Sequence, residues 1–267
     1  MKWDENYSSS EVDDRRSERG PGGGGGGGLG LIVRLFTMFG WRGALVGLVI
    51  AGAAVVGTQF MGGDDSTPSG QYQGTPAEER EKHLVAFVFD DVQTTWRNQL
   101  PGYRDARLEL FHGSLASACG TATEAVGPFY CPNDREVYVD LAFYEELRRR
   151  FGAPGEFAEA YVIAHEVGHH VQNQRGLLGG GSANSVHVEL QADCLAGAWA
   201  KDASRRGIVE VGDVDQALNA AAQIGDDAIQ RRETGRVRPE TFKHGSSAQR
   251  TNAFRTGLQG GATACGI

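Results

Sequence analysis

The stretch Ala164-His165-Glu166-Val167-Gly168-His169-His170 carries the most informative pattern in this chain of 267 residues. It contains an H-E-x-x-H motif within residues 157–175, a segment whose apolar spacing predicts a helix. His165 and His169 are one helical turn apart, so both imidazoles project from one face and can share a tetrahedral metal ion. Glu166 lies about 100° around the helix, where its carboxylate can act on water without binding the metal.

A third ligand follows at a workable distance. Glu189-Leu190-Gln191-Ala192-Asp193 lies on a second predicted helix, 185–204, beyond a glycine-rich loop. Glu189 can complete a His₂Glu zinc site with an open fourth position, the arrangement of a catalytic site, and Asp193 can accept the free ring N–H of a ligand histidine. The alternative is a pair of hydrogen-bonded core histidines beside a solvated acidic face. A third histidine ligand on the first helix is excluded, because Gln172 and Arg175 occupy the positions that the longer zincin motif requires.

Several longer stretches resemble the neutral zinc metallopeptidase family of bacterial membrane-anchored proteins. They are residues 161–172, 189–194, Gly127-Pro128-Phe129-Tyr130-Cys131-Pro132, His244-Gly245-Ser246-Ser247-Ala248-Gln249-Arg250, and the start of the chain with Trp3 and residues 12–16. The resemblance covers nearly the whole chain. It implies a gluzincin-like zinc peptidase with one zinc ion and a peptide or protein substrate.

The residues outside the motif predict an α+β fold, mostly helical with a small sheet, over residues 76–267. Thr75, Pro76 and Glu78 form a capping box that begins a helix ending near Pro101. Alternation predicts strands at 108–111 and 136–141, and further helices are expected at 142–151, 213–232 and 247–258. The strand around 137–139 either offers a sheet edge to an extended peptide or lies in the core.

The expected chemistry assigns Glu166 as general base: it takes a proton from zinc-activated water and passes it to the leaving amine. His244, in a loop before a helix, is the predicted donor to the oxyanion, with His187 and Tyr161 as the other candidates. A structural hydrogen-bonding role is the alternative for His244. His170 is turned away from the ligand face, so it is expected to contact a ligand residue or lie in the core and not to bind the metal itself.

The head of the chain predicts membrane attachment. Residues 1–30 are mixed in charge and include the run Gly22 to Gly28, which indicates a flexible, solvated cytoplasmic segment. Residues 43–61 have no charge and are long enough to span a bilayer, with 31–42 as a lead-in. Arg34 and Arg42 precede the segment, so a single-pass anchor would keep this flank inside and place the body outside. A cleaved signal peptide or a buried core helix is the alternative, and residues 62–75 read as a linker.

The four cysteines suit an oxidising exterior. Cys119, Cys131, Cys194 and Cys265 contain no C-x-x-C pair, so a cysteine zinc site is not expected and disulfides are. Three connectivities are possible. Pairing Cys119 with Cys131 and Cys194 with Cys265 is preferred, and free buried thiols are the alternative.

Charge excludes one class of partner. The formal net charge is −8, and residues 1–42 hold six basic and six acidic side chains, so the imbalance lies in the body and argues against nucleic acid. A non-catalytic extracytoplasmic binding or scaffold protein with a stabilising zinc is one alternative function. A zinc amidase acting on a cell-wall component is another. The sequence leaves substrate, regulation and oligomeric state open.

Overall fold

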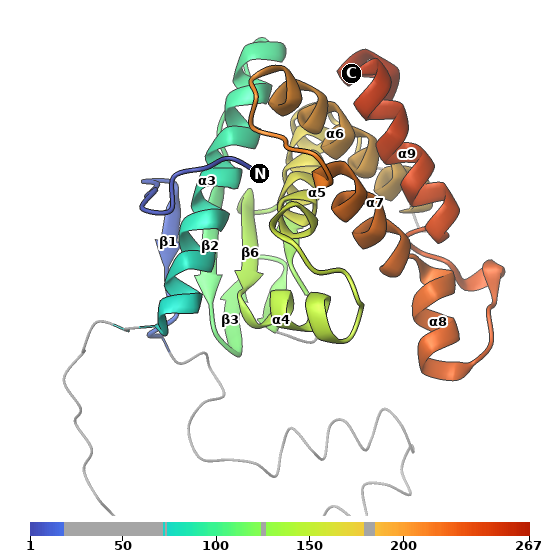
Figure 1. Cartoon of the computed structure of the whole chain (residues 1–267), viewed down its shortest axis with the longest axis horizontal. Helices are drawn as coiled ribbons and strands as arrows, with labels where there is room; N and C mark the ends of the chain where they lie inside the picture. The colour runs from blue at the N-terminus through green and yellow to red at the C-terminus, as the bar shows by residue number, and fades with distance from the viewer. Residues whose placement is uncertain (19–71, 73, 124–126, 179–184) are drawn as a thin grey trace, which may run out of the picture.

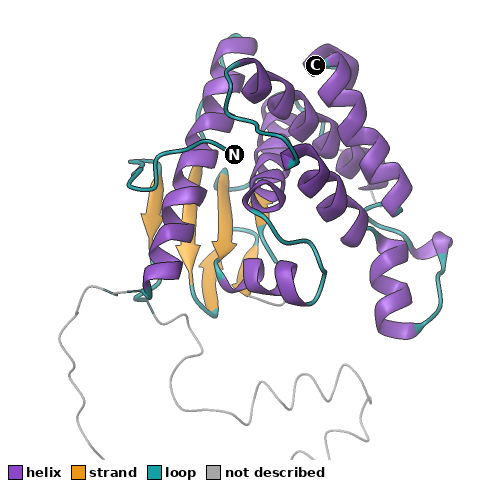
Figure 2. Ribbon diagram, in the orientation of Figure 1, coloured by secondary structure: helices purple, strands orange, loops and turns teal. Residues whose placement is uncertain are grey.

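The computed structural model describes residues 1–18, 72, 74–123, 127–178 and 185–267. Helices and strands are segregated, with the strands on one side of the molecule and most helices on the other (Figure 2). The elements run in the order β1 (Val12–Asp14), α3 (Pro76–Gln99), β2 (Arg107–Phe111), β3 (Ser114–Ser117), β4 (Gly120–Thr123), β5 (Phe129–Cys131), β6 (Glu136–Asp140), α4 (Ala142–Arg149), α5 (Glu156–Gln174), α6 (Ser185–Arg205), α7 (Asp213–Gln223), α8 (Asp226–Thr234) and α9 (Ser247–Gly260), with short 3₁₀ turns at Pro239–Thr241 and Ala262–Cys265. The predicted α+β class is confirmed.

The main sheet has four strands in the order β1-β2-β6-β5, and β3 and β4 form a separate hairpin. β1 and β2 pair parallel, as do β2 and β6, whereas β5 is antiparallel to β6 and occupies the edge. The predicted strands at 108–111 and 136–141 are therefore β2 and β6, and β6 lies inside the sheet. An extended peptide cannot pair with Val137-Tyr138-Val139, so that proposal is wrong and the core-strand alternative holds.

α3 crosses one face of the sheet, and α5 lies between this layer and the group formed by α6, α7 and α9 (Figure 1). The capping box predicted at Thr75 is present, with Glu78 bonded back to the Thr75 backbone. Trp96 of α3, Phe157 of α5 and Trp199 of α6 are fully buried, and the rings of Phe157 and Trp199 stack at 5.4 Å. The stacked pair joins α5 to α6 by aromatic burial.

α6 and α9 cross at very short range because glycine lies at the contact. A Cβ atom built on Gly257 would lie 1.8 Å from the carbonyl oxygen of Cys194, which no side chain could tolerate. The crossing brings α9 against the α6 turn that carries Asp193 and Cys194, and the Arg250 side chain of α9 reaches Asp193.

The helix predicted over 213–232 is two helices. Gly225 is extended, with φ −68° and ψ 145°, and separates α7 from α8. The carboxylates that follow it then bond to a later loop: Asp226 accepts backbone N–H groups of residues 243–245, and Asp227 accepts that of Ser247. These tertiary hydrogen bonds hold the chain in two helices at this point. The apolar periodicity of the sequence could not reveal them.

Residues 1–18 differ from the flexible segment expected over 1–30. They form β1 and pack on α3 and β2, with Val12 opposite Leu108 and Asp14 opposite Leu110. Arg16 is 4% exposed and pairs with Asp14 at 2.6 Å and Glu79 at 2.8 Å. The expectation failed because a three-residue strand has no periodicity and its partners are remote in sequence.

The predicted anchor 43–61, its lead-in 31–42, residues 19–30 and most of the linker lie outside the described residues. Within the part of the chain that the structure describes, no helix combines the length and apolar character needed to cross a bilayer.

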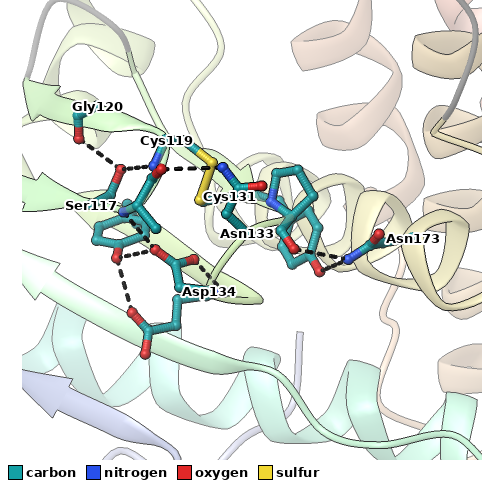
Figure 3. Close-up of a disulfide and its surroundings, with 12 residues drawn as sticks. Ser117, Cys119, Gly120, Cys131, Asn133, Asp134 and Asn173 are labelled. Carbon is teal, nitrogen blue, oxygen red and sulfur yellow. Dashed lines mark hydrogen bonds between the residues drawn. A yellow bond between two sulfur atoms is a disulfide. The ribbon is translucent and has the colours of Figure 1, made fainter.

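Both disulfides join the preferred partners, Cys119 with Cys131 and Cys194 with Cys265, so this connectivity is confirmed. The first attaches the residues around the β3–β4 turn to the end of β5 (Figure 3). Asn173 of α5 donates to the Tyr130 hydroxyl at 2.8 Å, so β5 is also held to α5. β5 is therefore fixed from both sides, close to the H-E-x-x-H helix.

Candidate metal centre

Two helices supply the candidate ligands. α5 carries His165, Glu166 and His169, and α6 carries Glu189 and Asp193. Gly168 allows the helices to approach, because a Cβ atom there would lie 3.1 Å from the carbonyl oxygen and 3.2 Å from the Cα of Ala192. A larger residue would push α6, and with it Glu189, away from the histidines.

Three donor atoms converge at one point. His165 Nε2 lies 3.2 Å from Glu189 Oε2, and His169 Nε2 lies 3.6 Å from Glu189 Oε1. All three candidate ligand atoms are within 4.8 Å of one another. Metal–ligand bonds of about 2.0–2.1 Å in a tetrahedral zinc site separate neighbouring ligand atoms by roughly 3.4 Å. The spacing and the nitrogen and oxygen donors therefore fit zinc.

The other ring nitrogen of each histidine is already engaged. His165 Nδ1 bonds to Asp193 Oδ1 at 2.8 Å, and His169 Nδ1 bonds to Gln172 Oε1 at 2.8 Å. Both contacts leave Nε2 to face Glu189. Such outer contacts orient metal-binding histidines, which is a further fit between the chain and a metal. Gln172 is held in turn by the carbonyl oxygen of Val188 on α6.

A buried arginine completes the surroundings of Asp193. Arg250 of α9 donates from Nε to Asp193 Oδ2 and from Nη2 to Asp193 Oδ1, both at 2.9 Å. It also donates to the Tyr161 hydroxyl, which itself donates to Asp193. Sequence reasoning missed Arg250 and Gln172. Arg250 stands in the quoted 244–250 stretch, but a lone arginine so far from Asp193 gives no signal of pairing.

The charges at the site shift the pKa values strongly in the metal-free protein. Burial disfavours the charged form of His165, but Asp193 and Glu189 outweigh it and raise its pKa to about 10. Burial likewise opposes ionisation of Glu189, yet His165 and His169 hold its pKa well below the usual range. Burial raises the pKa of Glu166, a shift that suits a general base.

The candidate ligands open on a cavity of about 600 Å³. Glu166, His244 and residues of β5 also line it. His244 is half exposed, and its Nδ1 lies 3.0 Å from Asp226 Oδ1. Of the other candidate donors, Tyr161 is committed to Asp193, and His187 is exposed on α6 and does not line the cavity. Asp226 is thus a further residue of the site that the sequence did not reveal.

Two residues that neighbour site residues in the sequence support the fold and do not enter the metal centre. His170 bonds through Nδ1 to the Tyr130 hydroxyl and through Nε2 to the carbonyl oxygen of Arg104, so it faces away from the metal centre as predicted. Cys194, next to Asp193, is in a disulfide and not in the site.

The comparisons with known proteins agree with this geometry. The model of a family described as "Putative neutral zinc metallopeptidase" matches residues 1–266. The chain is 36% identical to "Uncharacterized protein YpfJ" of Escherichia coli (strain K12), over 98% of this chain and 96% of that protein. It is 45% identical to "Uncharacterized protein Rv2575" of Mycobacterium tuberculosis (strain ATCC 25618 / H37Rv), over 66% and 67% of the two chains. No solved structure gives a significant match.

Proposed function

The chain belongs to this zinc metallopeptidase family, and from that premise we propose that it is a zinc-dependent endopeptidase whose centre is His165, His169 and Glu189. One observation carries the proposal. The carboxylate of Glu166 is buried beside the three donors, in the cavity that they share, and it is not one of them. A zinc site that only stabilised the fold would need no base at this position.

Zinc, when bound, supplies Lewis acidity that acidifies water and polarises a substrate carbonyl. Glu166 then takes the proton from the attacking water and returns it to the leaving amine. Its raised pKa makes it a better proton acceptor than an exposed carboxylate and a usable donor in the second step. Asp193 and Gln172 keep the two imidazoles fixed throughout.

His244 is the proposed donor to the oxyanion, at the rim of the same cavity. When its Nδ1–H donates to Asp226, Nε2 remains for the substrate. That nitrogen can donate only while the ring carries both protons. Asp226 also accepts three backbone N–H groups of the 243–245 loop, which holds the ring near the cavity.

Two features of the cavity favour an extended polypeptide as substrate. β5 pairs with β6 along one side, and no other described strand pairs with it, so the edge can accept a strand. Apolar side chains form much of the wall: Phe129, Phe143, Phe151, Val162, Ile224 and Ile229. We therefore propose cleavage of unfolded or extended chains next to a large apolar residue.

We also propose that the body works outside the cytoplasm. Its two disulfides are typical of an oxidising compartment, and the uncharged segment 43–61 has the length and composition of a membrane segment.

The test uses the full-length protein loaded with one equivalent of zinc. Glu166→Gln should retain zinc but lose at least 100-fold in the rate of cleavage of a reduced, unfolded polypeptide. His165→Ala should lose the metal as well. Glu240→Gln, the same change at an exposed position, is the matched control and should behave as the parent.

Equal cleavage by the parent and Glu166→Gln would refute the assigned base. Zinc binding without cleavage of any polypeptide would favour a scaffold. Cleavage of cell-wall amide fragments in preference to polypeptide would favour an amidase.

A further inference from the structure

The first 18 residues and the body are parts of one folded unit. β1 is an edge strand of the main sheet, paired parallel with β2. The backbone N–H of Leu108 donates to the carbonyl oxygen of Glu11, and that of Arg15 donates to the carbonyl oxygen of Leu110. Leu108 and Leu110 are fully buried. Without β1, the sheet would end at β2, whose backbone groups on that side would lose their partners.

Side chains extend this contact along α3. Asp90 of α3 accepts from the Tyr7 hydroxyl at 2.8 Å and from the Ser9 hydroxyl at 2.9 Å. The Nδ1 atom of His83, two helical turns earlier, lies 2.6 Å from the carbonyl oxygen of Tyr7. The Trp3 indole donates to Glu156 at the start of α5. The segment is therefore attached at several independent points.

Arg16 is the strongest of these links. Its side chain has no exposed surface, and its guanidinium pairs with Asp14 and with Glu79 of α3. A buried guanidinium needs such partners, because its desolvation is otherwise uncompensated. Arg16 is thus built into the boundary between the segment and the body.

The same arginine also contacts Tyr72, which stands shortly before α3 in the sequence. The Arg16 guanidinium lies over the Tyr72 ring, 4.9 Å from its centroid. The end of β1 and the start of α3 therefore lie at the same corner of the folded unit (Figure 1). In the sequence, the uncharged segment 43–61 stands between these two points.

These contacts conflict with a segment that crosses the bilayer once, because a single crossing would put residues 1–18 and the body on opposite sides. The charge bias for such a crossing is small. Only Arg34 and Arg42 flank the segment before it, and no lysine or arginine stands between residues 62 and 79 after it.

We propose that residues 1–18 and the described body, residues 72–267, lie on the same side of the membrane as parts of one folded unit. A strand pair and a buried ion pair cannot form across a bilayer.

Cysteine accessibility tests this in the full-length protein. All four native cysteines are in disulfides, so an added cysteine is the one free thiol. Ser8→Cys reports on the N-terminal segment and Ser204→Cys, at the end of α6, reports on the body; both positions are exposed. Spheroplasts are treated with a membrane-impermeant maleimide before and after lysis.

We expect the two variants to give one labelling pattern, differing by less than twofold in the fraction labelled before lysis. If Ser204→Cys is labelled in spheroplasts and Ser8→Cys only after lysis, the proposal is overturned. If both variants are protected until lysis, residues 1–18 and the body still lie on one side of the membrane. That side would then be the cytoplasm, which contradicts the proposal that the body works outside it. Neither readout depends on peptidase activity.

A double variant tests the contact itself. Ser9→Cys with Asp90→Cys replaces a hydrogen-bonded pair and should form a disulfide under mild oxidation, detectable by mass spectrometry of unreduced peptides. Ser8→Cys with Asp90→Cys is the matched control and should cross-link at least fivefold less. Cross-linking of the Ser8 pair as efficient as that of the Ser9 pair would contradict the docking even if both labels reported the same side.

Discussion

Replacing Arg250 with methionine should destabilise the protein and weaken its metal site together. The Arg250 side chain is buried and donates to both oxygens of Asp193, to the Tyr161 hydroxyl and to the carbonyl oxygen of Ile224. Methionine fills much of the same space but leaves the Asp193 carboxylate buried without its main countercharge. Removing one partner of a buried ion pair costs about 3–5 kcal/mol. In a body of this size that corresponds to a melting temperature lower by roughly 10 °C.

The effect on zinc follows from the shared acceptor. Asp193 Oδ1 also accepts from His165 Nδ1, so a shift of the carboxylate turns the imidazole. Loss of such an outer contact weakens metal binding by about 10- to 100-fold. We expect Arg250→Met to reach the lower part of that range and Asp193→Asn the upper part, because only the second replaces the direct partner of His165.

Thermal and urea unfolding of the metal-free protein, with zinc titration of the folded protein, measure both effects. Arg255→Met on the same helix is the matched control, because Arg255 is exposed and its replacement should change stability by no more than about 0.5 kcal/mol. The double variant with Asp193→Asn should lose at least about 1 kcal/mol less than the sum of the single variants. Equal unfolding of Arg250→Met and Arg255→Met, or no coupling in the cycle, would refute the reasoning.

Three further predictions concern the disulfides, the pH dependence of zinc binding and His244. Cys194 and Cys265 are 71 positions apart, so replacing both should lower the free energy of unfolding by about 4.4 kcal/mol. Replacing Cys119 and Cys131, which are 12 positions apart, should lower it by about 2.8 kcal/mol. If urea unfolding gave the reverse order, the loop-entropy explanation would be contradicted. The partners of His165 outweigh its burial and raise its pKa from the ordinary value of 6.5 to about 10. The protonated ring therefore stabilises the metal-free fold below pH 6.5, and that contribution is lost as pH rises through 10. Zinc must displace the same proton, so calorimetry should show affinity rising up to about tenfold per pH unit between pH 7 and 10; a flat profile would exclude this coupling. His244→Gln should lower kcat by about 10²-fold with zinc content unchanged, and full activity would remove His244 from the mechanism.

Much of the metal centre could be predicted because its parts are local in sequence. H-E-x-x-H puts two imidazoles on one helical face, and Glu189 and Asp193 repeat that spacing on the next long helix. Each pair is specified within one turn. The distance between the pairs depends on how α5 packs on α6, and Gly168 contributes to that packing.

The remaining contacts could not be predicted because they are tertiary. β1 has three residues and exists only through its pairing with β2, and β5 is equally short. Arg250 reaches Asp193 across 57 positions of the chain. A periodic pattern identifies which face of a helix is buried, but not which charged side chain of another helix will meet it.

The links that orient the metal centre also fix α6 in the body. Arg250 holds Asp193 from α9, and the neighbouring Cys194 is bonded to Cys265 in the 3₁₀ turn after α9. One turn of α6 is therefore attached to the C-terminal part of the chain by an ionic and a covalent link. Glu189 is on the preceding turn, so its distance of 3.2 Å from His165 depends on both links. Since a displacement of about 1 Å would take Glu189 out of coordinating range, zinc affinity should fall before the body unfolds when either link is broken.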